Sequence, residues 1–457
     1  MGSMVKPRAR NQDRISELSG ELVHRVFSFL PTVDAVRTTV LSKRWNKMWT
    51  KLETLDFDNK REFRKYKGVT SFATFVSRVL YFRDSSEIHK FRLNISCDCE
   101  YSPCIEDWIC TAVWRNVVEL DLCIKFSSGE ETFMLPECIF RCKMLRVLKM
   151  NLTPWMVTCD PPTSGSFPSL KFLHVSVSEP EDEVMQKLFS CCPVLEGLTI
   201  DGTIEGDTRN GVNYNFKISA PELKTLSISL ENIWELLDVS IDAPKLENFD
   251  LKRLGLTNCF FMGSAKSLVN ASIAFREHFE VVYNYDLSNF AMGLLDQVSN
   301  VKSLSLSTHC LEDLHLPKDW HLPAFRNVNQ LRLDFWDRSC WESLAVFLNS
   351  APNLEHLVLE DRTEGHKEFS ALHWNPPKYV PICLSSHLKT ISFKGFKGLP
   401  VEMEMVKYLL KNGHLLNKMT IFTGLRLSYA KQEELYREFM MFHRETTCHV
   451  EFMQLQV

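Results

Sequence analysis

A six-residue pattern, apolar-x-x-apolar-x-apolar, recurs along most of this chain. Successive copies mostly start 22 to 29 residues apart. Because side chains alternate across a β-strand, the last three positions of the pattern predict a short strand with one face buried. The copies are Ile88/Phe91/Leu93, Val117/Leu120/Leu122, Leu145/Leu148/Met150, Leu170/Leu173/Val175, Leu195/Leu198/Ile200, Leu223/Leu226/Ile228, Leu246/Phe249/Leu251, Leu268/Ala271/Ile273, Val301/Leu304/Leu306, Val328/Leu331/Leu333, Leu354/Leu357/Leu359 and Leu388/Ile391/Phe393.

A repeat of about 25 residues built on one short strand resembles the leucine-rich repeat. A single unit cannot bury its apolar edge, so stacked units are expected to form a solenoid with a parallel sheet and a continuous core. The Asn or Cys of the repeat consensus is missing where Lys125, Thr153, Thr203 and Glu231 stand. That side chain normally satisfies backbone groups at the turn, so we expect an irregular solenoid with unequal convex segments.

Two intervals between copies are longer than the rest, 33 residues from Leu268 to Val301 and 34 from Leu354 to Leu388. Each holds an extra segment, residues 277–297 in the first and 361–381 in the second. Long loops on repeats are commonly functional or mobile. A plain surface insertion explains both equally well.

Residues 13–58, before the first copy, predict three short amphipathic helices. Pro31 ends the first helix, because proline disfavours helical geometry in the residue before it. About 40 residues rarely bury enough surface to be stable alone, so this segment is expected to dock on a partner or on the following domain. The apolar positions are Leu22, Val23, Val26, Phe27 and Leu30 in the first helix, Val36, Val40 and Leu41 in the second, and Trp45, Met48 and Trp49 in a third that Ser42 can cap.

This segment resembles the plant F-box, a module that binds a Skp1-like adaptor. The resemblance implies attachment, through the adaptor, to the cullin and RING subunits of a ubiquitin ligase. Where the family usually has Pro and Asp, this chain has Ser19 and Gly20. The matching stretches are Asp13–Ser16, Glu21-Leu22, Phe29–Thr32, Asp34–Val36, Val40–Trp45 and Leu55–Asp58. The adaptor contacts implied by the resemblance are Leu18, Leu22, Phe27, Leu30, Pro31, Val40, Leu41, Trp45 and Trp49.

The C-terminal region resembles the FBD-type domain that often follows plant F-box and leucine-rich repeat segments. Its pattern predicts a helix over 402–411, a strand over 419–422, a helix over 428–443 and a strand over 450–452. Such units would close the exposed edge of the solenoid, which repeat proteins need for solubility. The matching stretches are Ala351–Glu355, Trp374–Pro377, Val380-Pro381, Leu384–Phe396, Met405–Asn412 and Leu416–Ile421.

The predicted fold class is therefore α/β, a three-helix F-box followed by an irregular leucine-rich-repeat solenoid with capping strand–helix units. The expected divisions are a flexible basic tail over 1–12, the F-box over 13–58, the solenoid over 59–374 and the FBD-type region over 375–457.

Composition excludes several classes of protein. A net charge of −4 in 457 residues provides no electrostatic footprint for nucleic acid. The sequence contains neither an apolar run long enough for a membrane span nor a signal peptide pattern, so no membrane partner is expected. The 15 cysteines are irregularly spaced and odd in number, which favours reduced thiols in the nucleus and/or cytoplasm. The densest group, from Cys97 to Cys110, lacks the paired spacing of a zinc site.

No motif of an enzyme is present: no phosphate-binding loop, zinc helix, nucleophile elbow or dinucleotide fingerprint. Cys191-Cys192 precedes a predicted strand and is expected to fill a buried turn. No catalytic residue, metal or cofactor is predicted. We interpret the chain as a non-catalytic subunit that recognises the substrate of a Skp1–cullin–F-box ligase, with a protein target that the sequence cannot name. Two alternatives stay open, a small-molecule-dependent receptor, which needs convergent Arg and Lys on adjacent repeats, and a scaffold that acts without the ligase.

Overall fold

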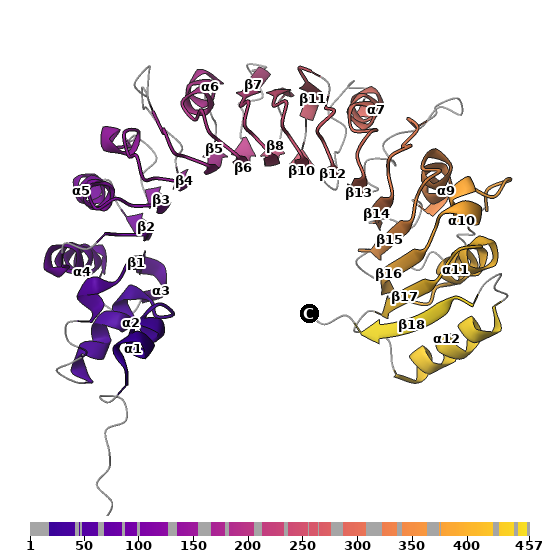
Figure 1. The fold of residues 1–457 in the computed structure, drawn as a ribbon, viewed down its shortest axis with the longest axis horizontal. Helices are drawn as coiled ribbons and strands as arrows, with labels where there is room; N and C mark the ends of the chain where they lie inside the picture. Colours follow the sequence, from indigo (N-terminus) through magenta and orange to yellow (C-terminus); the bar gives the residue numbers. More distant parts are fainter. Residues whose placement is uncertain are drawn as a thin grey trace, which may run out of the picture. The chain divides into compact units, whose positions relative to one another are not determined.

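The computed structural model describes residues 18–41, 45, 48–62, 68–84, 87–97, 101–126, 135–153, 166–178, 182–204, 213–232, 236–254, 256–263, 265–275, 287–307, 322–335, 341–362, 374, 376–423, 429–442 and 447–454. The chain divides into two compact units, residues 1–177 and 178–457. The first runs from indigo to magenta in Figure 1 and the second from magenta to yellow.

The first unit begins with short helices and continues with parallel strands in sequence order, β1-β2-β3-β4-β5. The strands line one side of the unit and the longer helices lie on the other (Figure 1). Its helical elements are α1 (Gly20–Phe27), α2 (Thr32–Arg37), η1 (Thr38–Val40), η3 (Trp49–Lys51), α3 (Asn59–Glu62), α4 (Gly68–Phe82), α5 (Ser102–Trp114) and η5 (Glu137–Ile139). Its strands are β1 (Thr54–Asp58), β2 (Lys90–Cys97), β3 (Glu119–Phe126), β4 (Val147–Thr153) and β5 (Phe172–Ser178).

The second unit repeats this architecture with its main strands in the order β6-β8-β10-β12-β13-β14-β15-β16-β17-β18, all parallel. Its main strands are β6 (Gly197–Ile204), β8 (Thr225–Asn232), β10 (Asn248–Leu254), β12 (Asn270–Phe275), β13 (Ser303–Ser307), β14 (Gln330–Phe335), β15 (His356–Asp361), β16 (Thr390–Phe396), β17 (Lys418–Thr423) and β18 (His449–Gln454). Its helices are α6 (Asp182–Ser190), α7 (Leu287–Gln297), α9 (Trp341–Ser350), α10 (Ile382–Ser386), α11 (Pro400–Asn412) and α12 (Tyr429–Met441).

Every predicted copy of the hexad coincides with one of these strands, and its apolar residues are buried. In-register pairs such as Leu120↔Leu148 and Leu331↔Leu357 stack the apolar rows of neighbouring strands. The solenoid prediction is therefore confirmed. The sheet also has a strand that the hexad search missed, β1, which lies within the segment resembling an F-box.

A second parallel sheet, in the order β11-β9-β7, replaces helices in part of the second unit. Phe216, Ile218, Val239 and Ile241 bury its inner face. At the β11 edge, the side-chain oxygen of Gln297 in α7 accepts a hydrogen bond from the backbone N–H of Phe261 (2.7 Å). A helix side chain thus satisfies a backbone donor of this edge strand. The strands are β7 (Asn213–Ser219), β9 (Leu236–Asp242) and β11 (Leu256–Phe261). Unequal convex segments were expected, but not that some of them would be strands.

The N-terminal helices form where the sequence places their signals. The backbone N–H of Leu22 donates to Ser19 Oγ (3.3 Å), so serine caps α1 in place of the family's usual residue. Pro31 separates α1 from α2. The expected third helix falls partly on residues 42–44 and 46–47, outside the described residues, and its described end is the 3-10 turn η3 rather than an α-helix.

The C-terminal elements agree with their predictions. Helix α11 covers 402–411 and ends at Gly413, and β17, α12 and β18 lie where the pattern placed them. Glu402 closes a capping box, since its carboxylate accepts the backbone N–H of Leu399 (2.8 Å). It also accepts the N–H of Lys397 (3.1 Å), which ties the turn before α11 to the helix.

Two predictions from composition meet the structure here. Of the helices in the described ranges, none combines the length and hydropathy that crossing a membrane requires. The cysteines that the structure describes are free thiols. Cys192 is buried as expected, and burial raises the pKa of its thiol, whereas Cys191 is half-buried.

Candidate functional site

The N-terminal helices expose a group of apolar side chains to solvent. Val40 is 86% exposed and Phe29 is 77% exposed, which are high values for side chains of this kind. We call this group the docking patch. It consists of Leu22, Val26, Phe29, Val40 and Leu41.

Other apolar residues of the same helices hold them on the first sheet. The rings of Phe27 and Trp45 pack with centroids 5.3 Å apart, and both side chains are buried. Thr32 Oγ1 accepts the backbone N–H of Asp56 (2.7 Å), which joins α2 to β1. Residues other than those of the docking patch therefore provide these contacts, and the docking patch stays exposed.

The residues predicted to bind an adaptor fall into three groups in the structure. Leu22, Val40 and Leu41 are exposed in the docking patch. Leu18, Leu30, Pro31 and Trp49 are half-buried. Phe27 and Trp45 belong to the core instead.

Sequence reasoning did not include Val26 and Phe29 among these contacts. The spacing of Leu22, Val26 and Phe29, i, i+4 and i+7, already placed them on one helix face. Fully burying one side chain of this size against a partner gains about 1.5–3 kcal/mol.

The solvent side of the main strands, which we call the open face, is polar. In the first unit it holds a row of alternating charges. Burial alone would raise the pKa of Glu119. The hydrogen bonds and charges of Lys90 and Lys149 nevertheless hold that pKa below its ordinary value. The ion pairs are Arg92–Asp56 (3.4 Å), Arg92–Asp121 (3.5 Å), Lys90–Glu119 (2.8 Å) and Lys149–Glu119 (3.5 Å).

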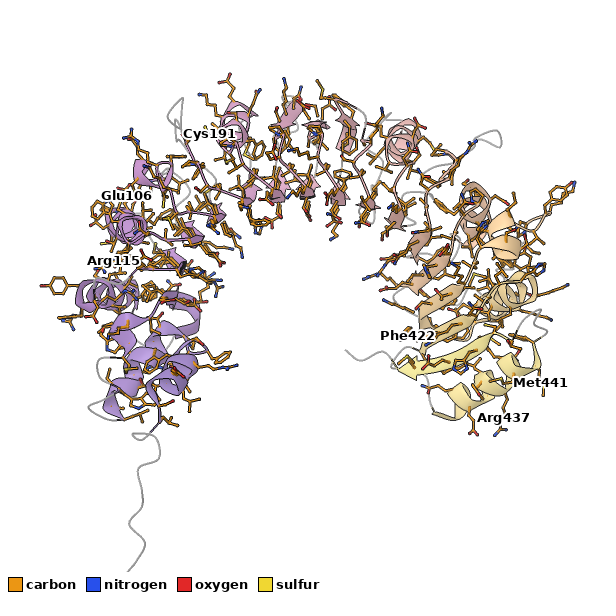
Figure 2. All side chains as sticks on the ribbon, viewed as in Figure 1. Glu106, Arg115, Cys191, Phe422, Arg437 and Met441 are labelled. Carbon is orange, nitrogen blue, oxygen red and sulfur yellow. The ribbon has the colours of Figure 1, made fainter. Side chains whose placement is uncertain are left out.

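In the second unit the open face carries a network of two arginines and two carboxylates on β14, on β15 and just after it. Arg332 and Arg362 both bind Asp334 and Glu360. Farther along, Phe422 of β17 adds an aromatic side chain (Figure 2). The two arginines converge from adjacent repeats, as a small-molecule receptor would need, but their charges are matched by the carboxylates. This network therefore does not favour that alternative.

No group of His, Cys, Asp and Glu suited to hold a metal ion occurs among the residues that the structure describes. Polar side chains on the open face would determine which partner fits, since exposed ion pairs themselves add little stability.

Comparison with known proteins agrees with this arrangement. The F-box domain model matches residues 15–56, a model for the leucine-rich repeats of "FBD-associated F-box protein At5g56370" matches residues 105–269, and the FBD model matches residues 375–421. The Arabidopsis thaliana protein "F-box/LRR-repeat protein 13" is 32% identical over 432 residues, 91% of each chain. The chain belongs to the plant F-box/FBD/leucine-rich-repeat family.

Two further Arabidopsis relatives extend the similarity over almost the whole chain. "FBD-associated F-box protein At4g10400" is 30% identical over 96% of this chain and 100% of its own length. "Putative F-box/FBD/LRR-repeat protein At1g66290" is 31% identical over 96% and 93%. Members of this family are generally non-catalytic adaptors that recognise substrates, and their F-box implies binding to a Skp1-like adaptor.

Proposed function

We propose that this protein is the substrate-recognition subunit of a Skp1–cullin–F-box ubiquitin ligase. The docking patch binds the Skp1-like adaptor, which brings the cullin and RING subunits. The open face of the repeats holds a target protein near the ubiquitin-charged enzyme, which raises the effective concentration of its lysines.

The observation that carries this proposal is that some apolar residues of the F-box helices are buried while others are exposed. Phe27 and Trp45 are buried against each other, while Phe29 and Val40 are mostly exposed to solvent. A helical segment that only closed the end of a sheet would not gain from outward apolar residues. A segment built to bind a partner would.

The test is co-purification of the full-length protein from plant cells with its adaptor, cullin and RING subunits. We expect the Phe29→Ala/Val40→Ala variant to lose all three subunits while keeping its fold. A matched control, Tyr379→Ala/Ile382→Ala, removes equally exposed apolar side chains from the second unit and should keep all three. Recovery of the cullin with the first variant would refute the assignment of the docking patch.

Target binding is tested in the same cells by comparing bound proteins with and without proteasome inhibition. A protein that accumulates on the Phe29→Ala/Val40→Ala variant without inhibition is the expected substrate, because that variant binds it but cannot pass it to the ligase. If no protein accumulates under either condition, substrate capture by the open face is wrong.

We also propose that the protein acts in the nucleus and/or cytoplasm. The free thiols of its described cysteines support this, because disulfides form and persist in the secretory compartments. A fluorescent fusion found in the endoplasmic reticulum would contradict the assignment.

A further inference from the structure

A second exposed apolar surface lies on the first repeats, outside the F-box. Tyr81 is 81% exposed at the end of α4, and its ring packs edge-on against exposed Phe82 with centroids 5.1 Å apart. Trp114, at the end of α5, is 77% exposed. Single exposed apolar residues are ordinary, but three large aromatic side chains at the ends of successive helices are not.

These helix ends follow one edge of the sheet, the edge at which the strands begin. Along it, the residue just before each strand accepts a backbone N–H from the turn before the next strand: His89 donates to Glu53 (2.8 Å), Val118 to His89 (3.1 Å) and Arg146 to Val118 (2.9 Å). The turns that precede β1, β2 and β3 are thereby joined in order. We call this the start edge of the first unit.

The start edge begins at the last turn of the F-box. The backbone N–H of Asp84, just after α4, donates to the carbonyl of Thr50 in η3 (3.3 Å), and Thr50 Oγ1 donates to the Asp84 carboxylate (3.2 Å). Arg115, just after α5, then donates to the carbonyl of Asp84 (2.7 Å). Figure 2 places Arg115 beside α4 and α5. The F-box, the end of α4 and the end of α5 thus form one continuous, hydrogen-bonded surface.

Several polar groups of this surface have partners within it. Asp84 binds Thr50, Arg115 binds Asp84, and Asn116 donates to Glu87 (3.3 Å). Tyr81, Phe82 and Trp114 add large apolar side chains that are mostly exposed to solvent. Tyr and Trp are the residue types that most often anchor protein interfaces.

We propose that the Skp1-like adaptor makes a second contact, beyond the F-box, with Tyr81, Phe82 and Trp114 on the start edge. The choice of occupant follows from continuity, since the surface starts at the segment that binds the adaptor. Neighbouring strands lie about 4.7–4.9 Å apart, so the turn before β3 is about two strand spacings from η3, within reach of a partner bound to the F-box. This inference rests on the proposed function.

Such a contact has a mechanical consequence. An adaptor that touches only a segment of some 40 residues could rock relative to the repeats that hold the target. A second contact on the repeats fixes the orientation of the target, which effective proximity to the ligase requires.

The experiment is calorimetric titration of the full-length protein with a purified plant Skp1-like protein. Tyr81→Ala/Trp114→Ala should raise the Kd by about tenfold or more, the effect of losing two interface anchors. The control Tyr379→Ala/Ile382→Ala should leave the Kd within about twofold of the parent value. Trp114→Phe should keep most of the parent's affinity, because the phenylalanine ring can fill the same contact. Thermal unfolding checks that every variant is folded, which exposed positions allow.

The outcomes separate this inference from the function on which it rests. If Phe29→Ala/Val40→Ala abolishes binding and Tyr81→Ala/Trp114→Ala leaves the Kd unchanged, the second contact is wrong and the docking patch stands. If the control weakens binding as much as the start-edge variant, the effect is not local and the inference is also wrong. If the docking-patch variant binds normally, the proposed function itself fails.

Discussion

Residues 20–41 in the F-box and residues 390–421 in the FBD region differ in where their apolar side chains point. In the F-box, Leu22, Val26, Phe29, Val40 and Leu41 face solvent. In the FBD segment most apolar side chains of β16, α11 and β17 are buried, Phe393 completely, while Tyr408 is half-buried and Leu415, in the turn between α11 and β17, is exposed. The first segment leaves apolar side chains exposed and the second closes a core, although both carry a similar density of apolar residues.

The same chemical change in the two segments should therefore have opposite effects. In the FBD region Phe393→Ala removes a fully buried ring and should cost about 3–5 kcal/mol of unfolding free energy. Adaptor affinity should not change, because the ring lies in the second unit. Urea unfolding followed by circular dichroism measures the first effect and a pulldown with a Skp1-like protein the second. An unfolding free energy within 1 kcal/mol of the parent would show that this core tolerates a cavity.

In the F-box, Phe29→Ala should leave the unfolding free energy within about 0.5 kcal/mol, since the ring is exposed. It should weaken adaptor binding by about 1–3 kcal/mol, roughly tenfold to a hundredfold. Val36→Ala removes a half-buried side chain, intermediate between the buried and the exposed apolar residues, and serves as the comparison within the same helices. If Phe29→Ala lowers the unfolding free energy without weakening adaptor binding, the assignment of Phe29 to the docking patch rather than to the core is wrong.

The two segments should also respond differently to pH, because only the FBD region buries an acid without exposure to water. Burial, helped by the nearby charge of Asp361, raises the pKa of Glu402 to about 8 against the lowering effect of the N–H groups of Leu399 and Lys397. Between the ordinary pKa of 4.5 and this value the folded state holds more protons than the unfolded state. Stability of the second unit should therefore fall as the pH rises through that window.

Glu402→Gln keeps the capping box but removes the titrating group, so it should flatten this decrease. The control is Glu404→Gln, at an exposed position of the same helix. The test compares the urea unfolding midpoints of the parent and of both variants at pH 5, 6.5 and 8. Parallel curves for the parent and Glu402→Gln would mean that the buried acid does not cause the decline.

The smallest effect is expected at the start of the F-box. A Cβ added at Gly20 would meet no atom within 4 Å, so Gly20→Ala fits α1 without strain. It should stabilise the protein by about 0.4–1 kcal/mol by restricting the unfolded chain. Ser19 should be left alone, because Ser19→Pro would remove the cap on Leu22. A melting temperature lowered by Gly20→Ala would show that the first turn needs glycine's freedom.

Strands were more predictable from the sequence than surfaces were. The hexad identifies strands through a fixed inward spacing, and residues such as Leu148 and Leu357 are buried as that spacing requires. The second sheet was missed because an interval of some 25 residues can hold either a helix or another strand. Alternation at Phe216 and Ile218 was the available signal.

The docking patch was predictable only in part. An amphipathic helix pattern shows which residues share a face, but not whether that face meets the core or a partner. Phe27 and Phe29 are both apolar and two positions apart, yet one is buried and the other exposed. The packing of Phe27 on Trp45 decides between them, and that contact depends on the fold of the entire segment.

Hydrogen–deuterium exchange of the full-length protein, with and without a saturating plant Skp1-like protein, tests the central comparison most directly. The account predicts slower exchange in residues 18–41 on binding, and unchanged exchange in residues 390–421, which are already buried in their own core. Unchanged exchange in residues 18–41, or protection in residues 390–421 instead, would contradict the assignment of the F-box patch as the docking surface.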